Sequence, residues 1–145
     1  MIETLRQRSR PYLFSNTLAP VIAGTTLDVL DTLTSSTSLR DALFRNAEYM
    51  RAGLASRGFA IAPGIHPIIP VMVYEAPLAQ ALAQRLYERG ILVTGFFYPV
   101  VPRGKARVRV QLSAAHTREQ LDRALDAFAT AGRDLGLLSR PKGNA

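Results

Sequence analysis

The chain has 145 residues, of which 48% are hydrophobic and 20% are charged, a composition that excludes a disordered chain and allows one domain with a core. It contains no cysteine, which excludes disulfides and thiolate metal sites, and its two histidines, His66 and His116, lack the usual metal-ligand spacings. The formal charge is +7, but the arginines are spread and no aromatic residues alternate with them as stacking platforms, so no nucleic-acid partner is predicted.

The first 35 residues are predicted to form an arm of helices. Residues 2–9 resemble the end of a helix, and Arg10-Pro11 terminates it because the residue before a proline disfavours the helical region. After a crossing segment, a second helix is expected from the capping residues 15–17 to about Leu33, with Pro20 in its first turn. This arm has no evident place in a compact unit with the rest, so we interpret the chain as a piece of a longer protein.

Ser15 and Asn16 stand at the expected start of that second helix. The free backbone N–H groups of a helix N-terminus bind anions readily, so these two residues are candidates for a phosphate contact. The alternative is a plain helix cap. The opening residues lack an apolar signal core, and no apolar run reaches the ~20 residues of a membrane span. We therefore expect a cytoplasmic protein without a membrane partner.

Residues 36–138 are predicted to form one α/β unit. The segment 39–57 is an amphipathic helix with Leu39, Leu43, Ala47, Met50 and Leu54 on its buried side, and Gly58 ends it. Further helices are predicted at 75–89 and from a capping box at Thr117 and Gln120 onward, and strands at 59–61, 68–73, 91–94 and 106–112. Pro70 indicates an edge strand or a bulge. The fold class is therefore a small, largely antiparallel sheet covered by helices, followed by a flexible tail at 139–145.

The last predicted strand carries two arginines. Arg107 and Arg109 are two positions apart, so their side chains leave the same face of the strand. The alternate positions point to the core and are apolar: Ala106, Val108, Val110 and Leu112. A guanidinium offers a planar fork that matches a carboxylate or phosphate with two parallel hydrogen bonds. The pattern indicates a clamp for a small anionic substrate, and the alternative is an ordinary solvated strand face.

Four segments resemble a known family. They are Ser-Arg-Pro-Tyr-Leu-Phe-Ser-Asn at 9–16, Ile-Leu-Val-Thr-Gly-Phe-Phe-Tyr-Pro-Val-Val-Pro at 91–102, Ala-Arg-Val-Arg at 106–109 and Ser-Ala-Ala-His-Thr at 113–117. Together they resemble the α-oxoamine synthases, pyridoxal-phosphate enzymes of the aspartate-aminotransferase fold, and within them the glycine C-acetyltransferases. The resemblance covers about residues 2–138 and only the C-terminal portion of the family. It implies that residues 1–35 are a remnant of the large domain and a dimer arm, and that 36–138 are the small domain.

The resemblance also implies site residues. Ser15 and Asn16 match the pair that reaches the cofactor phosphate of the partner subunit, and Arg109 matches the arginine that holds the substrate carboxylate. The family's Schiff-base lysine lies upstream of this chain, and neither Lys105 nor Lys142 has its sequence context. No catalytic residue is therefore assigned, and the chain alone is predicted to be inactive.

The implied reaction converts glycine and acetyl-CoA to 2-amino-3-ketobutyrate and CoA, in threonine breakdown, with pyridoxal 5'-phosphate as cofactor. The implied partner is a second copy in a homodimer or a complementing N-terminal half. Two alternatives stay open: a sister synthase of the 8-amino-7-oxononanoate or 5-aminolevulinate type, and a non-enzymatic basic α/β binding module.

Overall fold

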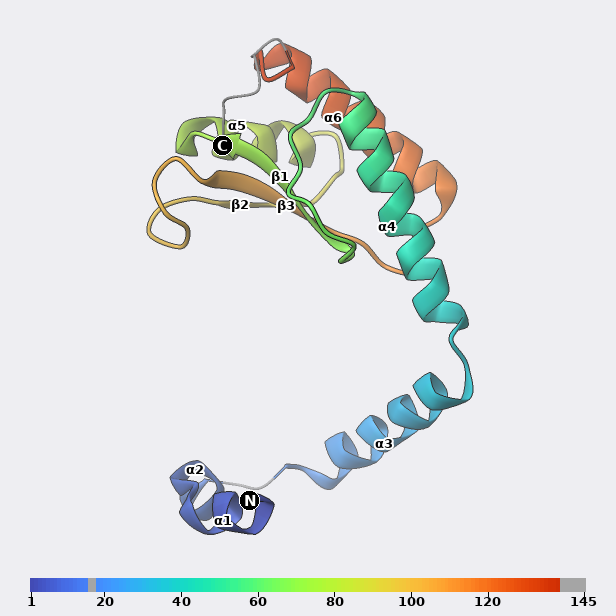
Figure 1. The fold of residues 1–145 in the computed structure, drawn as a ribbon, viewed down its shortest axis with the longest axis vertical. Coiled ribbons are helices and arrows are strands. Elements are labelled where there is room, and N and C mark those ends of the chain that lie inside the picture. Colours follow the sequence, from blue (N-terminus) through green and yellow to red (C-terminus); the bar gives the residue numbers. More distant parts are fainter. Residues whose placement is uncertain (16–17, 139–145) are drawn as a thin grey trace. The chain divides into compact units, whose positions relative to one another are not determined.

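A computed structural model describes residues 1–15 and 18–138, without the side chain of Leu13. The chain divides into two compact units, Met1–Thr37 and Ser38–Ala145, which we call the first and the second unit (Figure 1). The predicted tail at 139–145 lies outside the described residues. The assignment of 1–35 to a larger domain and of 36–138 to a small domain stays a prediction.

The first unit consists of helices α1 (Ile2–Arg8), α2 (Arg10–Phe14) and α3 (Pro20–Ser35). The short helix α2 was not predicted. It forms because Pro11 occupies its first turn, where the missing N–H of a proline costs no helical hydrogen bond. The predicted start of the second long helix is wrong, because Ala19, and not the segment 15–17, precedes the first residue of α3. Neither α1 nor α3 buries a residue.

The described part of the second unit holds one antiparallel sheet in the order β1 (Ile68–Tyr74), β3 (Ala106–Gln111) and β2 (Thr94–Phe96). The predicted fold class is confirmed. Pro70 lies on an edge strand, as predicted, and its carbonyl accepts from the N–H of Ala62 at 3.0 Å on the outer side of β1. Its missing N–H therefore faces away from β3 and removes no ladder bond. The register shifts between Met72 and Tyr74, and Tyr74 has a φ of 70°.

Two predicted strands differ from the structure. Residues 59–61 make only an isolated bridge, between Ile61 and Val71. Two backbone hydrogen bonds hold this segment to β1, since the N–H of Met72 donates to the carbonyl of Ala60 at 2.7 Å and the N–H of Ala62 donates to that of Pro70. Side-chain packing adds to them, because Phe59 is buried and meets the ring of Phe128 edge-on at 5.6 Å. The strand predicted at 91–94 begins only at Thr94.

Three helices cover one face of this sheet: α4 (Ser38–Ser56), α5 (Ala76–Tyr87) and α6 (Arg118–Asp134) (Figure 1). Helix α5 contacts all three strands, α4 contacts β1, and α6 packs on α4 and α5. Alternate residues of β1 and β3 point into this layer and are buried. The largest fully buried side chains of the core are Phe128, Met50, Leu54, Ile69, Leu82, Leu86 and Leu125.

The ends of the covering helices follow the sequence closely. The predicted capping box is confirmed, since Thr117 Oγ1 accepts from the N–H of Gln120 at 3.3 Å and Gln120 Oε1 accepts from the N–H of Thr117 at 2.9 Å.

The predicted core position Leu39 is wrong: its side chain is 57% exposed, because the first turn of α4 extends beyond the core (Figure 1). None of the helices in the described ranges is long and apolar enough to cross a lipid bilayer.

Candidate functional site

The sheet face opposite the helices carries the two predicted arginines. Along β3, Ala106, Val108 and Val110 are buried, whereas Arg107 is half-buried and Arg109 is exposed. This alternation confirms that both arginines leave the same face. Because the described helices of the second unit all lie on the other side of the sheet, this unit leaves the two side chains open to a ligand or to another protein surface.

The register places each arginine between two side chains of the neighbouring strands. Arg109 is opposite Pro70 of β1 and Thr94 of β2. Arg107 is opposite Met72 and Phe96. Because directly opposed residues point to the same side of a sheet, the arginines are surrounded by apolar or small side chains on this face.

The two guanidinium groups have different partners. Arg107 Nε donates to the carbonyl of Lys105 at 3.0 Å, so this side chain is held against the turn that precedes β3. The guanidinium carbon of Arg109 lies 4.5 Å from the centroid of the Phe96 ring. No hydrogen bond or ion pair joins it to another described residue, so all five of its N–H donors are available. Arg109 therefore keeps its whole guanidinium edge, Nε–H included, for two parallel hydrogen bonds to an anion such as a carboxylate, whereas the Nε–H of Arg107 is already used.

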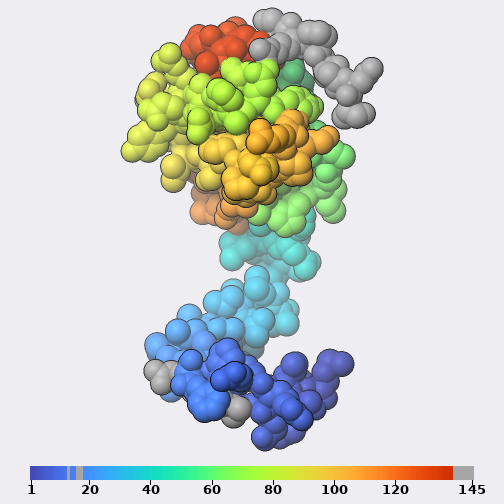
Figure 2. All heavy atoms as spheres, turned by 90° about the vertical axis from the view of Figure 1, so that its left-hand side faces the viewer, coloured from blue at the N-terminus to red at the C-terminus, as the bar shows by residue number. Residues whose placement is uncertain are grey.

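The connection between β2 and β3, residues 97–105, lies on the surface of the second unit (gold to orange in Figure 2). The N–H groups of Val100 and Val101 both donate to the carbonyl of Phe97, at 2.9 and 3.2 Å. A groove of about 370 Å³ runs beside this connection, with Tyr74, Tyr98 and Arg103 in its lining. Arg103 stacks over the Tyr98 ring at 4.5 Å. Sequence reasoning missed Tyr74, because the irregular register that places it there is not visible as a pattern.

Of the predicted phosphate pair, only Ser15 is described, because Asn16 lies outside the described residues. Ser15 follows the last turn of α2, and its N–H donates to the carbonyl of Pro11 at 2.8 Å. Its side chain is exposed, and no described residue bonds its hydroxyl. The helix N-terminus expected at this point is absent, so a phosphate role for Ser15 rests on its hydroxyl and not on a helix dipole. Ser15 belongs to the first unit and Arg109 to the second.

Both histidines stabilise local turns. His66 Nδ1 accepts from the N–H of Ile68 at 3.1 Å, and His116 Nδ1 accepts from the N–H of Ser113 at 3.2 Å. Asn46 supports the second turn by donating to the carbonyls of Ser113 and His116 at 3.1 and 3.0 Å. Within residues 1–15 and 18–138, no three His, Cys, Asp or Glu side chains gather as metal ligands would.

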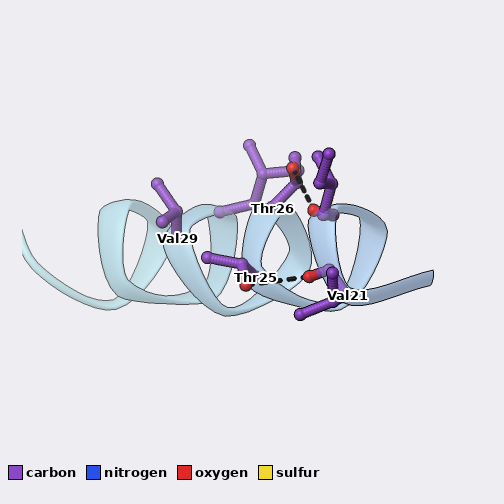
Figure 3. A pocket seen from close by; sticks show the side chains of 6 residues that line it. Val21, Thr25, Thr26 and Val29 are labelled. Carbon is purple, nitrogen blue, oxygen red and sulfur yellow. Dashed lines mark hydrogen bonds between the residues drawn. The ribbon is translucent and has the colours of Figure 1, made fainter. Parts of the chain in front are cut away.

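Helix α3 presents an apolar surface of a different kind. All six residues that line its shallow hollow come from this one helix (Figure 3). The hydroxyls of Thr25 and Thr26 turn back to donate to the carbonyls of Val21 and Ile22, at 2.9 and 2.7 Å. A small-molecule site needs convergent polar groups that orient the ligand, and here these groups are already used by the helix. The α3 surface is therefore suited to packing rather than to chemistry.

The helix-covered sheet and its open arginine face are general features, and sequence similarity identifies the family to which they belong here. The chain is a member of the aminotransferase class I and II family, whose profile matches residues 1–128. It is similar to 2-amino-3-ketobutyrate coenzyme A ligases. It is 52% identical to that of Salmonella typhimurium over 139 residues, covering 96% of this chain and 35% of that protein. It is 45% identical to the mitochondrial 2-amino-3-ketobutyrate coenzyme A ligase of Homo sapiens, covering 95% of this chain and 33% of that protein. The chain thus spans about a third of the length of these relatives.

Solved structures show the same fold. Serine palmitoyltransferase of Sphingomonas wittichii superposes with a TM-score of 0.88 at 31% identity, covering 94% of this chain and 35% of that one. A variant of the S. paucimobilis enzyme, solved with a bound PLP–myriocin aldimine, gives a TM-score of 0.87 at 29% identity, covering 93% and 34%. The predicted family resemblance is confirmed, and so is pyridoxal phosphate as the cofactor of the complete enzymes of this family.

Proposed function

We propose that this chain is the C-terminal portion of a pyridoxal-phosphate-dependent acyltransferase. The complete enzyme would join glycine to the acetyl group of acetyl-CoA, giving 2-amino-3-ketobutyrate and CoA, in threonine breakdown. The observation that carries the proposal is Arg109, which stands on the open sheet face with every N–H donor free of described partners. The similarity to 2-amino-3-ketobutyrate coenzyme A ligases supports this choice of substrates.

The task of Arg109 is to bind and orient the carboxylate of the amino-acid substrate. Its guanidinium can form two parallel hydrogen bonds to the two carboxylate oxygens, which fixes the direction in which the α-carbon points. A charged hydrogen bond of this kind contributes about 1.5–3 kcal/mol. Because Arg109 is exposed in this chain, solvent screening places its contribution here at the low end of that range.

Pyridoxal phosphate, when bound, supplies an electron sink for the negative charge that develops at the glycine α-carbon. Of the residues in this chain, Ser15 and Asn16 would hold its phosphate from the partner subunit. The exposed Ser15 hydroxyl, which no described residue bonds, fits that task as a hydrogen-bond donor. Lys105 is exposed in a turn, where its backbone N–H donates to the carbonyl of Pro102. We assign the Lys105 side chain no role in covalent chemistry.

We further propose that this chain requires a partner to act. The partner that supplies the Schiff-base lysine is an N-terminal half. A second copy completes the homodimer, and the compartment is the cytoplasm. We expect the isolated chain, mixed with pyridoxal phosphate, glycine and acetyl-CoA, to give neither an internal-aldimine absorbance band nor CoA release. A borohydride-reducible adduct with turnover would contradict this expectation and would point to Lys105 or Lys142.

The role of Arg109 is tested in a complemented enzyme. The chain is co-expressed with the upstream portion of the Salmonella typhimurium relative, and CoA release is measured while glycine and acetyl-CoA are varied separately. For Arg109→Lys, which keeps the charge but loses the fork, we expect the KM for glycine to rise about tenfold while the KM for acetyl-CoA stays the same. Arg107→Lys, on the same strand face, is the matched control and should change either KM less than threefold. Equal effects of both variants would refute the assignment.

A sister synthase is the second candidate, because the chain is also 39% identical to an 8-amino-7-oxononanoate synthase of Petrotoga mobilis. The same complemented enzyme separates the two possibilities. Faster CoA release from acetyl-CoA than from longer acyl-CoA thioesters supports the acetyltransferase, and the reverse order supports the sister enzyme.

A further inference from the structure

We propose that Phe96 is the positioning residue of Arg109. Its ring forms a platform that holds the guanidinium with its N–H edge free for the substrate carboxylate. The inference rests on the proposed function, since it concerns how this arginine is prepared for its ligand. Phe96 itself touches no reacting atom in this scheme.

The contact follows from the register of the sheet. Thr94 is directly opposite Arg109, and Phe96 is opposite Arg107, so Arg109 and Phe96 are diagonal neighbours on one sheet face. Aromatic and long side chains reach across such diagonals. Because Thr94 is short, it leaves the space in which the Arg109 side chain turns toward the ring. The guanidinium carbon then lies 4.5 Å from the ring centroid.

A ring orients an arginine without using its hydrogen bonds. Two other arginines of the second unit are fixed by carboxylates: Arg57 pairs with Asp126 at 3.1 Å, and Arg89 pairs with Asp134 at 3.2 Å. Such a partner would compete with a substrate for the same N–H donors. The face of Phe96 attracts the cation through its quadrupole and leaves the donors at the guanidinium edge unoccupied.

The platform also restricts a flexible side chain. Arginine has many rotamers, and a ligand must order them when it binds. A guanidinium that already rests on Phe96, which is half-buried and anchored in β2, has less freedom to lose. The register of the strands thus sets the direction of the Arg109 side chain, and Phe96 keeps the guanidinium in that orientation.

The first experiment observes Arg109 directly in the full 145-residue chain. NMR follows its side-chain Nε–Hε signal, which is assigned by its disappearance in Arg109→Lys. We expect a ring-current shift of this signal that is lost in Phe96→Leu and retained in Phe96→Tyr. Tyr98→Leu, which removes the comparable ring beneath Arg103, is the matched control and should leave the Arg109 signal in place. An Arg109 signal that is the same in Phe96→Leu as in the unmodified chain overturns the inference.

The second experiment measures binding and turnover. Glycine is titrated against the Arg109 signal at constant ionic strength, with methylammonium chloride as a probe that lacks the carboxylate. In the complemented enzyme, Phe96→Leu should raise the KM for glycine about two- to fivefold with the KM for acetyl-CoA unchanged, and Phe96→Tyr should restore it. A merely structural role of Phe96 would change both KM values or neither, and that result also overturns the inference.

The two experiments distinguish failure of the inference from failure of the proposed function. If the ring-current shift depends on Phe96 but Arg109→Lys leaves the KM for glycine of the complemented enzyme unchanged, the carboxylate role of Arg109 is wrong. If Arg109→Lys raises that KM but Phe96→Leu does not, only the positioning role is wrong. The unfolding midpoint of each variant is measured in parallel, and Phe96→Tyr supplies the comparison if Phe96→Leu is unstable.

Discussion

The two units of this chain differ in what their apolar residues do. Helices α4 and α6 of the second unit keep apolar residues on one side and bury them in the core of that unit, with Met50, Leu54 and Phe128 fully enclosed. Helix α3 of the first unit has only two charged residues, and all its large apolar side chains are more than half exposed, from Val29 at 51% to Val21 at 74%. Apolar content alone therefore makes no core.

The distribution of those residues explains the difference. A helix with apolar residues along one side can bury all of them by packing that side against one neighbouring layer of structure, as α4 and α6 do. A helix that is apolar on most sides needs cover from several directions, and none of the described residues of the first unit bury α3. The second unit is thus expected to fold by itself, whereas the first requires another protein surface.

The largest expected effect comes from emptying the core of the second unit. Phe128 is fully buried and packs edge-on against Phe59. Phe128→Ala should lower the free energy of unfolding by about 3–5 kcal/mol, measured by urea denaturation. Leu27→Ala in α3, where the side chain is 62% exposed, is the matched control and should change it by less than about 0.5 kcal/mol. Comparable losses in both variants would show that the first unit has a core of its own.

The next effect concerns the apolar surface of α3. We expect the unmodified chain to self-associate in light scattering and to bind a dye for exposed apolar surface. Replacing Ile22 and Leu30 together by Gln should weaken that association by roughly 2–4 kcal/mol, because two exposed apolar side chains that the association would cover are lost. Leu27→Gln, on another side of the helix, shows whether one face dominates. A clean monomer without dye binding in the unmodified chain would contradict the prediction.

Two glycine-to-alanine substitutions, one in each unit, are expected to change stability in opposite directions. A Cβ at Gly53 in α4 would lie 2.5 Å from Leu125 Cδ1, inside the core, so Gly53→Ala should destabilise the second unit by about 1–3 kcal/mol. A Cβ at Gly24 in α3 meets no described heavy atom within 4 Å. Gly24→Ala should therefore raise the helix content by circular dichroism and stabilise α3 by about 0.5–1 kcal/mol. Destabilisation by Gly24→Ala would indicate a close partner for α3.

The smallest effect is a pH dependence at the start of α6. The carboxylate of Glu119 accepts hydrogen bonds from its own backbone N–H, which has the larger effect, and from the Thr117 hydroxyl. Both hold the pKa of Glu119 below its ordinary value. A depressed pKa gives stability that is present above the ordinary value and is lost as the pH falls through the depressed one. Because this carboxyl is fully exposed, we expect a small loss, visible as an NMR titration of Glu119 below that of an unstructured peptide. Glu119→Gln should remove this contribution to the pH dependence of stability, and an unshifted titration of Glu119 would contradict the assignment.

Local sequence signals found most of the second unit. The apolar spacing of α4, the capping box at Thr117 and the alternation around Arg109 are each set by residues within one or two turns, and each is seen in the structure. Pro70 indicated an edge strand or a bulge, since a proline has no N–H to donate to a ladder, and β1 is an edge strand. The resemblance of residues 91–102 and 106–109 to a family then identified the class of enzyme.

Other features depended on contacts between distant parts of the chain. The ring of Phe59 packs on Phe128, which lies far along the sequence, and the segment that follows it pairs with β1 by a single bridge. The start of α3 at Pro20 is instead a local difference, since Ser15 ends the short helix α2 and Ala19 precedes α3. Of these two differences, only the packing of Phe59 was therefore decided by a residue outside the local window.

The candidate site divides in the same way. The sequence by itself determined that Arg107 and Arg109 share a strand face, because the two-residue period of a strand is local. Only the tertiary structure decided which arginine is free. The pairing of β2 with β3 brings Phe96 beneath Arg109, while the preceding turn engages Arg107 through the carbonyl of Lys105. The physical reason is that a guanidinium's partners come from neighbouring strands and turns, whose register no single strand sequence encodes.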